Sequence, residues 1–295
     1  MIKRKSFTLM KLFTLSSLFS ISAVDPAGPF TAALHAKPAV DRPFHLIERL
    51  SENTYINWTG GWIYAKVTVP VRRAESISLT EARLRAVREA KERARTELSR
   101  GVLLLPLDSR GNYGEHMREN SRLRQDFESI DRYYRLLEHT TGEGSVTIRM
   151  GLPLFGSTGL LRRIPASMLP EFDRALKLPV NHEKFTGLIV YTELAASYRP
   201  SLRPALALKT GERFLSIDNT RDSRGFYFME EESARNFGRA GDRPFVLYAT
   251  AELNGTDLII DTDDAQRILG NAGLLRSVRE GRVAIIVSGP GMTGR

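Results

Sequence analysis

The sequence FTGLIVYTE, at Phe185–Glu193, begins a group of three apolar runs. The second run is SLRPALALK at Ser201–Lys209, and the third, RFL at Arg213–Leu215, follows the tight turn Thr-Gly-Glu at 210–212. Short apolar runs that are bounded by Gly and Pro signals are typical of β-strands. We therefore expect these residues to form the centre of a sheet domain to which the rest of the chain connects.

The carboxy-terminal third of the chain predicts more strands of the same kind. We expect them at 245–252, 257–260 and 282–288, with a hairpin at Leu253–Thr256 because Asn-Gly suits a type I′ turn. Asp263 and Asp264 begin a short helix that ends at Leu269. Residues 181–289 are therefore predicted to form a mostly antiparallel, sheet-rich module with short helices.

The amino-terminal half predicts a strand followed by a long helix. Apolar residues alternate with polar ones over Tyr55–Val71, as on a strand with one buried face. Ser78 and Glu81 form a capping-box pattern, and a stripe at helical spacing follows: Leu79, Ala82, Ala86, Ala90, Ala94 and Leu98. We expect the stripe to pack on the sheet and Gly101 to end the helix.

A second helix is predicted over Glu115–His139, where Leu123, Phe127, Ile130, Tyr134 and Leu137 follow heptad spacing. Alternation at 146–150 predicts a strand after it. The chain is thus an α+β protein whose strand-helix-helix-strand unit at 54–155 precedes the sheet-rich module. A connector at 156–180 contains a short helix at 166–176, and 290–295 form a flexible tail.

The first 36 residues have the pattern of a secretory signal peptide. Lys3, Arg4 and Lys5 precede an apolar stretch at 12–24, and small residues lead to Ala36. We expect cleavage after Ala36, with an uncleaved anchor helix as the alternative. A polar leader arm at 37–53 would follow, with no direct membrane span after it, because no later segment has the roughly 18 apolar residues of a transmembrane helix. The predicted location is periplasmic or secreted.

The composition is that of an ordinary globular protein. The 295 residues are 42% hydrophobic and 26% charged, with a formal net charge of +9. Because the first 36 residues carry part of that excess, and the remainder is spread over Arg–Glu alternations, we expect no nucleic-acid partner. The chain has no cysteine, which excludes disulfides, thiolate metal sites, a cysteine nucleophile and a lipid-modified amino-terminal Cys.

The candidate sites are few. No catalytic, cofactor or metal residues can be named, and the five histidines lack metal-ligand spacing and are expected at the surface. Asp257, Asp261, Asp263 and Asp264 could hold calcium, although helix capping explains the last two better. Two sets of residues are candidates for binding: for an anion, Arg199, Arg203 and Arg213; for an exposed interaction surface, Trp58, Trp62, Phe226 and Tyr227, with core packing as its alternative.

The strand WIYAKV at 62–67, followed by the alanine-spaced helix EARLRAVREA at 81–90, resembles the amino-terminal module of lipoprotein-20-like envelope proteins and of the flagellar T-type basal-body protein. The later segments 186–190, 203–206, 242–245, 257–260, 264–265 and 282–287 resemble the carboxy-terminal half of uncharacterised secreted proteins that carry that module. The resemblance implies a non-enzymatic role with envelope or flagellar basal-body partners and supplies no catalytic residues.

Three function classes follow from these observations. The first is an exported, non-enzymatic cell-envelope protein with a structural or assembly role, flagellar or outer-membrane associated. The second is a periplasmic binding module for an anionic ligand, which would use either the arginine-rich face of the long helix or the set Arg199, Arg203 and Arg213. The third is a hydrolase with two catalytic carboxylates, which sequence spacing alone does not identify.

Overall fold

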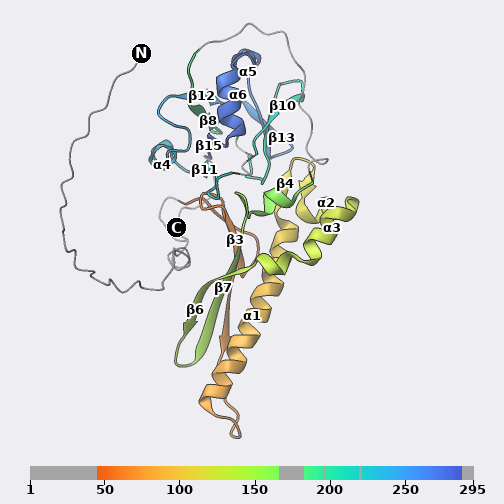
Figure 1. Ribbon diagram of the computed structural model, residues 1–295, viewed down its shortest axis with the longest axis vertical. Coiled ribbons are helices and arrows are strands. Elements are labelled where there is room, and N and C mark those ends of the chain that lie inside the picture. The colour runs from red at the N-terminus through yellow and green to blue at the C-terminus, as the bar shows by residue number, and fades with distance from the viewer. Residues whose placement is uncertain (1–44, 166–182, 196, 219–220, 288–295) are drawn as a thin grey trace, which may run out of the picture. The chain divides into compact units, whose positions relative to one another are not determined.

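The structure is a computed structural model, and it describes residues 45–165, 183–195, 197–218 and 221–287 (Figure 1). The predicted α+β class is confirmed, since helices and several sheets are both present. The helices are α1 (Leu79–Leu104), α2 (Tyr113–Glu119), α3 (Ser121–Glu128), α4 (Glu231–Asn236), α5 (Thr262–Leu269) and α6 (Ala272–Arg279), with 3-10 turns η2 (Ile130–Tyr133) and η3 (Leu160–Arg163).

A five-stranded antiparallel sheet organises the amino-terminal half. Its spatial order is β1 (Ile47–Arg49), β2 (Thr54–Asn57), β3 (Trp62–Pro70), β7 (Ser145–Pro153) and β6 (Arg135–Thr141). Strand β1 lies within the segment that we expected to be a leader arm. A separate two-stranded ribbon pairs β4 (Pro106–Asp108) with β5 (Gly111–Asn112).

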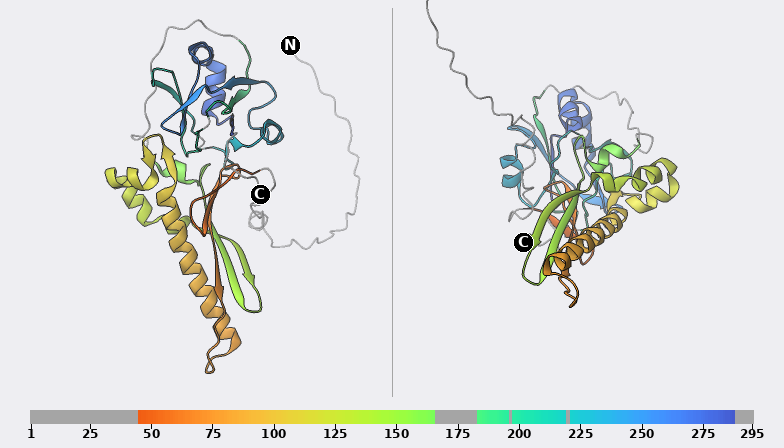
Figure 2. Two further views of the ribbon diagram at one scale, coloured as in Figure 1. Left: turned by 180° about the vertical axis from the view of Figure 1, so that it is seen from behind. Right: turned by 60° about the horizontal axis from the view of Figure 1, so that its bottom comes forward.

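Helix α1 packs on one face of this sheet, along β3 and β7 (Figure 2). Ser78 caps the helix by accepting a hydrogen bond from the amide of Glu81. The predicted alanine stripe is confirmed as the buried face of α1, because Ala82, Ala86, Ala90 and Ala94 are all buried. These small side chains let the helix backbone approach the sheet closely, whereas Leu79 is 41% exposed and does not belong to the buried face.

Two predictions for this half are wrong. Gly101 does not end the helix, which continues to Leu104, because Gly101 is a buried contact point between α1 and Thr54 of β2. The prediction of a single helix at 115–139 is also wrong. The structure has α2, α3 and η2 in its place, and the last part of the predicted heptad seam lies in strand β6, which is an edge of the sheet.

The carboxy-terminal half contains two four-stranded sheets. One has the order β11 (Tyr227–Phe228), β15 (Val283–Ile286), β8 (Gly187–Tyr191) and β12 (Pro244–Tyr248). The other has the order β10 (Arg213–Ser216), β9 (Ala205–Ala207), β14 (Asp257–Ile259) and β13 (Ala251–Leu253). The predicted hairpin is confirmed: β13 and β14 pair antiparallel, and Asn254 and Gly255 have positive φ.

The expectation of mostly antiparallel pairing is wrong here. All three pairings in the sheet of β8 are parallel, and β14 also pairs parallel with β9. Helices α5 and α6 lie between β12 and β15 in the sequence, as parallel connections require. The uninterrupted apolar run of β8, buried over Gly187–Val190, is the pattern of a strand covered on both faces.

The two halves share one apolar core. A single cluster of buried residues includes Ile63 and Leu98 of the amino-terminal half together with Leu188 and Leu258 of the carboxy-terminal half. The signal peptide, the helix expected at 166–176 and the tail at 290–295 lie outside the described residues. Among the helices of the described ranges, none is long and apolar enough to cross a membrane.

Candidate functional site

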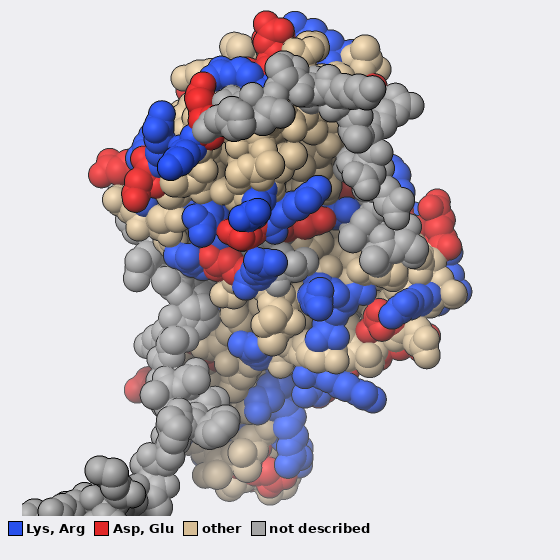
Figure 3. All heavy atoms as spheres, turned by 45° about the horizontal axis from the view of Figure 1, so that its top comes forward, with Lys and Arg blue, Asp and Glu red and all other residues tan. Residues whose placement is uncertain are grey.

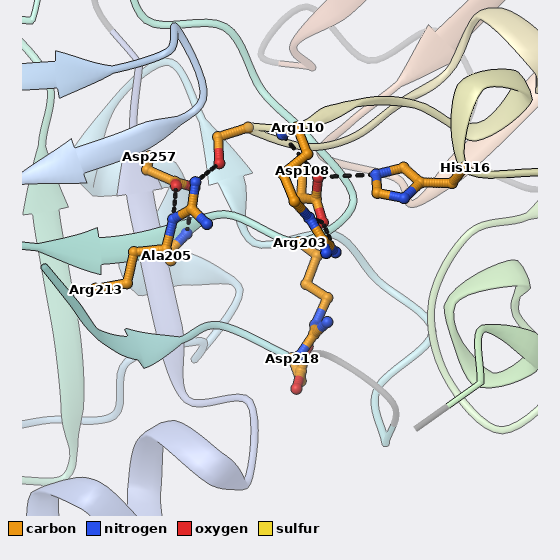
Figure 4. A network of polar contacts seen from close by, with 9 residues as sticks. Asp108, Arg110, His116, Arg203, Ala205, Arg213, Asp218 and Asp257 are labelled. Carbon is orange, nitrogen blue, oxygen red and sulfur yellow. Dashed lines mark hydrogen bonds and ion pairs between the residues drawn. The ribbon is translucent and has the colours of Figure 1, made fainter. Parts of the chain in front are cut away.

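A group of interacting charged side chains lies where β4 and α2 meet β9, β10 and β14 (Figure 4). We call it the polar cluster. Its members are Asp108, Ser109, Arg110, His116, Arg203, Arg213, Asp218 and Asp257. Because the first four belong to the amino-terminal half and the last four to the carboxy-terminal half, the polar cluster joins the two.

Asp108 is the acceptor on the amino-terminal side. His116 Nε2 lies 2.9 Å from its Oδ1, and Arg110 Nη2 donates to its Oδ2 over 2.7 Å. Burial would raise the pKa of the Asp108 carboxyl, but the hydrogen bonds from His116 and Arg110 outweigh it and hold that pKa well below its usual range. Asp108 is therefore an anion at neutral pH.

Helix α2 fixes His116 in this position. Asn112 and Glu115 form a reciprocal capping box at the start of the helix, which sets the direction in which His116 projects one residue later. The side chain of His116 is only 6% exposed. A buried imidazole that faces a carboxylate at this distance has its polar group satisfied by that contact.

Asp257 is the acceptor on the carboxy-terminal side. Its Oδ2 accepts a hydrogen bond of 2.5 Å from Arg213 Nε, and its Oδ1 accepts one of 3.0 Å from the amide of Ala205. The same guanidinium also donates to the hydroxyl of Ser109, which follows β4. Arg213 is therefore the side chain that connects the carboxylate of one half to a hydroxyl of the other.

The polar cluster leaves little space for a substrate. Arg203 is 4% exposed, and its guanidinium donates to Asp218 over 2.6 Å. The cavity between Asp108, Arg203, Arg213 and Asp257 measures about 10 Å³, which is the room of one water molecule. The arrangement thus stabilises a joint between two parts of the fold and has no room for a small-molecule reactant.

The three arginines that we expected to bind an anion do not form one site. Arg203 and Arg213 line the same cavity, but each donates to a carboxylate of the protein. Arg199 lies apart from them and donates to Glu48, whose other oxygen accepts from Trp58 Nε1 at 2.8 Å. The positive charge of all three side chains is therefore balanced within the fold.

The expected exposed aromatic surface is wrong for three of its four residues. Trp58, Phe226 and Tyr227 are at most 1% exposed, and Trp58 packs edge-on against Tyr227 at 5.4 Å between ring centroids. These rings belong to the core that joins the two halves. Trp62 is half-buried beneath the guanidinium of Arg135, 5.7 Å from its ring centroid.

The expectation that the histidines lie at the surface is wrong for His45 and His116, which are 3% and 5% exposed. No sequence pattern marks either histidine as buried, and His116 meets Asp108 only through the turn that joins β4 to β5.

The structure also shows Asp257 to be a buried partner of Arg213. Its position at the start of a strand, two residues after a hairpin glycine, gave no indication of that role.

Three of the four carboxylates considered for calcium interact with basic side chains, and the fourth, Asp263, lies in the first turn of α5. Asp257 pairs with Arg213, Asp261 with Lys209 at 2.7 Å, and Asp264 with Arg267 at 3.8 Å. Within the described part of the chain, no three His, Asp or Glu side chains lie close enough together to hold a metal ion. Figure 3 shows the same mixing of charge on one face, where acidic and basic side chains alternate across the centre of the view.

A second buried ion pair repeats the pattern. Arg239 is 4% exposed, and its Nη1 lies 2.5 Å from Oδ2 of Asp222, which also accepts from Arg224. Burial lowers the pKa of the Arg239 guanidinium to about 10, partly offset by the charge of Asp222. Arg239 therefore remains a cation at neutral pH and balances the Asp222 carboxylate.

Comparison with known proteins gives one family match. Residues 187–289 match a family model described as the second domain of Treponema pallidum Tp0624. The match begins at β8 and extends just beyond β15, so it covers the two four-stranded sheets and none of the five-stranded sheet. No protein in the curated set matches the chain.

Proposed function

We propose that this chain is an exported, non-enzymatic protein of the cell envelope with a structural or assembly role, and that it acts by binding envelope or flagellar basal-body proteins. The observation that carries the proposal is the polar cluster. Its acids and bases neutralise one another around a space of about 10 Å³, as expected for a structural joint and not for a reaction site. The amino-terminal signal pattern supports export.

The resemblance of the strand at 62–67 and the helix at 81–90 to the lipoprotein-20-like module supports the envelope setting. In the structure these segments pack against each other as β3 and α1, through the alanine stripe that carries the resemblance. The chain has no cysteine for a lipid anchor, so the proposal places its envelope association in contacts with a partner protein.

Crosslinking followed by affinity purification from the native envelope tests this function. The expected result is reproducible recovery of the same envelope or flagellar protein with the full chain. Recovery of the chain without any envelope protein, in the soluble periplasmic fraction, would contradict the assembly role.

The alternative of a binding module for an anionic ligand has less support. Arg199, Arg203 and Arg213 each donate to a carboxylate, so an added anion would have to displace a partner that is already in place. Thermal-shift measurements at low salt with phosphate and with small dicarboxylates test it. A rise in melting temperature with either anion would favour this alternative over the assembly role.

A further inference from the structure

Strand β3 has an unpaired edge over its second half. Its first four residues pair with β2, and Lys66 donates one further bond to the carbonyl of Asn53, after which the chain of β2 turns away towards β1. On the opposite side β3 pairs with β7 along its whole length. In the described part of the chain, no strand pairs with residues 67–70 of β3 on the β2 side.

The direction of the backbone groups follows from this register. Val71 donates to Gly144, and Leu154 donates to Gly61, so the odd-numbered residues of β3 bond to β7. The even-numbered residues face the β2 side. The amide and carbonyl of Thr68 and the carbonyl of Pro70 therefore point towards the open edge, where no β-ladder satisfies them.

A groove runs along this open edge. It measures about 570 Å³, a volume typical of ligand sites, and lies between β3, one flank of α1 and the turn that joins β1 to β2. Val67 and Thr68 of β3 line it, together with Glu52 and Asn53 of the turn. The helical wall comes from one flank of α1: Glu92, Arg93, Thr96, Glu97 and Arg100.

We propose that this groove binds an extended peptide segment of a partner protein, which adds a strand to β3 beside α1. Strand addition to an open sheet edge obtains its affinity from main-chain hydrogen bonds and its specificity from alternate side chains. Here the bonds would join the peptide to the amide and carbonyl of Thr68 and to the carbonyl of Pro70. Residues 67–70 provide roughly 13 Å of strand edge, enough for about four peptide residues.

The walls of the groove determine which occupant fits. The groove lies between β3, α1 and the 52–53 turn, and the backbone groups at its open edge are those that an extended chain would pair with. The wall is polar and carries both charges. Its ion pair Arg100–Glu97 is 3.1 Å long, with the arginine side chain 70% exposed, and such exposed pairs exchange partners at little cost. The segment is therefore expected to be polar, with small side chains facing Val67.

This inference rests on the proposed function and names its partner surface. The test uses the full chain and a random heptapeptide phage library as the probe. An enriched peptide is then synthesised with a fluorescent label, and its affinity is measured by anisotropy. We expect enrichment of peptides that bind the unmodified protein and lose binding when alternate backbone amides are N-methylated.

Thr68→Pro is the diagnostic variant, because it removes the one amide that faces the groove without removing a hydrogen bond of the ladder. It should weaken peptide binding about tenfold or more. Thr141→Pro is the matched control. Gly142 donates to Ser145, so the amide of Thr141 points away from β7 at the other edge of the same sheet. This control should leave the affinity within about twofold.

A second variant, Thr96→Trp, fills the groove from α1 and leaves β3 unchanged, so it tests the site even if Thr68→Pro fails to fold. The proposal is overturned if no peptide is enriched, or if selected peptides bind both variants as well as they bind the unmodified protein. It is also overturned if the unmodified protein is a dimer that becomes monomeric with Thr68→Pro, because a second copy would then occupy the groove. If Thr68→Pro recovers an envelope partner as well as the unmodified chain does, the groove is not the binding surface for that partner, but the proposed envelope role still holds.

Discussion

At the scale of single residues, the charged side chains of this protein stabilise the fold. Asp257 is 1% exposed and accepts from both Arg213 and the amide of Ala205. Asp108 has the same position on the other side of the polar cluster, between His116 and Arg110. Removing Asp257 leaves the buried amide of Ala205 and the partly buried guanidinium of Arg213 without this acceptor, and removing Asp108 leaves the buried imidazole of His116 without its partner. The loss of such a partner costs more than the net contribution of the ion pair itself.

Asp257→Ala should lower the free energy of unfolding by about 3 to 5 kcal/mol, because it leaves the Arg213 guanidinium without its buried carboxylate. Asp261→Ala is the matched control. Asp261 pairs with Lys209 in an exposed ion pair whose side chains are 53% and 65% exposed, so its loss should cost less than about 1 kcal/mol. Urea unfolding measures both. Equal losses of unfolding free energy in the two variants would show that the polar cluster stabilises the fold no more than an exposed ion pair does.

The depressed pKa of Asp108 makes stability sensitive to acid. In the unfolded chain Asp108 takes up a proton near its ordinary pKa of about 4, whereas in the folded protein it stays ionised to lower pH. Its contribution is therefore complete above pH ~4 and is lost as the pH falls. Between about pH 5 and about pH 3, the unfolding free energy should fall more steeply for the unmodified protein than for Asp108→Asn.

Asp264→Asn is the control for this measurement. Burial and then the neighbouring carboxylates Asp261 and Asp263, opposed by Arg267, raise the pKa of Asp264, so this residue adds no acid-sensitive stability. Its substitution should leave the steepness of the acid dependence unchanged or greater. If Asp108→Asn lost stability between these pH values as steeply as the unmodified protein, the role given to Asp108 would be wrong.

At the scale of elements, close approach of α1 to the sheet depends on residues without large side chains. Gly101 is a point of close contact, since a Cβ there would overlap Cγ2 of Thr54 in β2. In an exposed helix, Gly→Ala stabilises by about 1 kcal/mol. Here Gly101→Ala should destabilise by about 1 to 3 kcal/mol, because the overlap outweighs the gain in helix propensity.

The double variant Gly101→Ala/Thr54→Ser tests that explanation. Serine keeps the hydroxyl that donates to the carbonyl of Glu97 and removes the methyl group that causes the overlap. Thermal unfolding should show recovery of most of the lost stability in the double variant. If it is no more stable than Gly101→Ala alone, the contact with Thr54 is not the cause.

Elements with a clear periodicity could be predicted from the sequence. The alanine stripe of α1, the alternation of β3 and the Asn-Gly hairpin of β13 and β14 each follow from local spacing and are confirmed. The helix expected at 115–139 is wrong because its seam residues also suit a strand end. Leu137 contacts Gly151 of β7 across the sheet, and pairing with β7 overrides the helical spacing.

At the scale of the whole described chain, the two halves should unfold together. Trp58 of the first half packs against Tyr227 of the second, and the amide of Gly225 donates to Thr59 at 3.0 Å. Tryptophan fluorescence and far-UV circular dichroism should therefore give coincident urea transitions. Two separate transitions would show that the shared core does not couple the halves.

The polar cluster could not be predicted from the sequence, for a physical reason. Asp108 and His116 come together through a two-stranded turn, whereas Ser109 and Arg213 are 104 residues apart in the sequence. Such contacts depend on how two sheets pack, so no regular spacing of residues in the sequence indicates them. The open edge of β3 depends likewise on where β2 ends, which the alternation over 55–71 does not mark.

The most direct test of the account is site-specific photocrosslinking in the native cell. A benzophenone amino acid placed at position 100 lies on the wall of the groove, where it replaces an arginine side chain that is 70% exposed. One placed at Leu136, 48% exposed on β6, is the control at the far edge of the sheet. We predict that position 100 crosslinks to a single envelope protein and that position 136 does not. No crosslink from position 100, with the protein intact and present in the envelope fraction, would contradict the proposed groove.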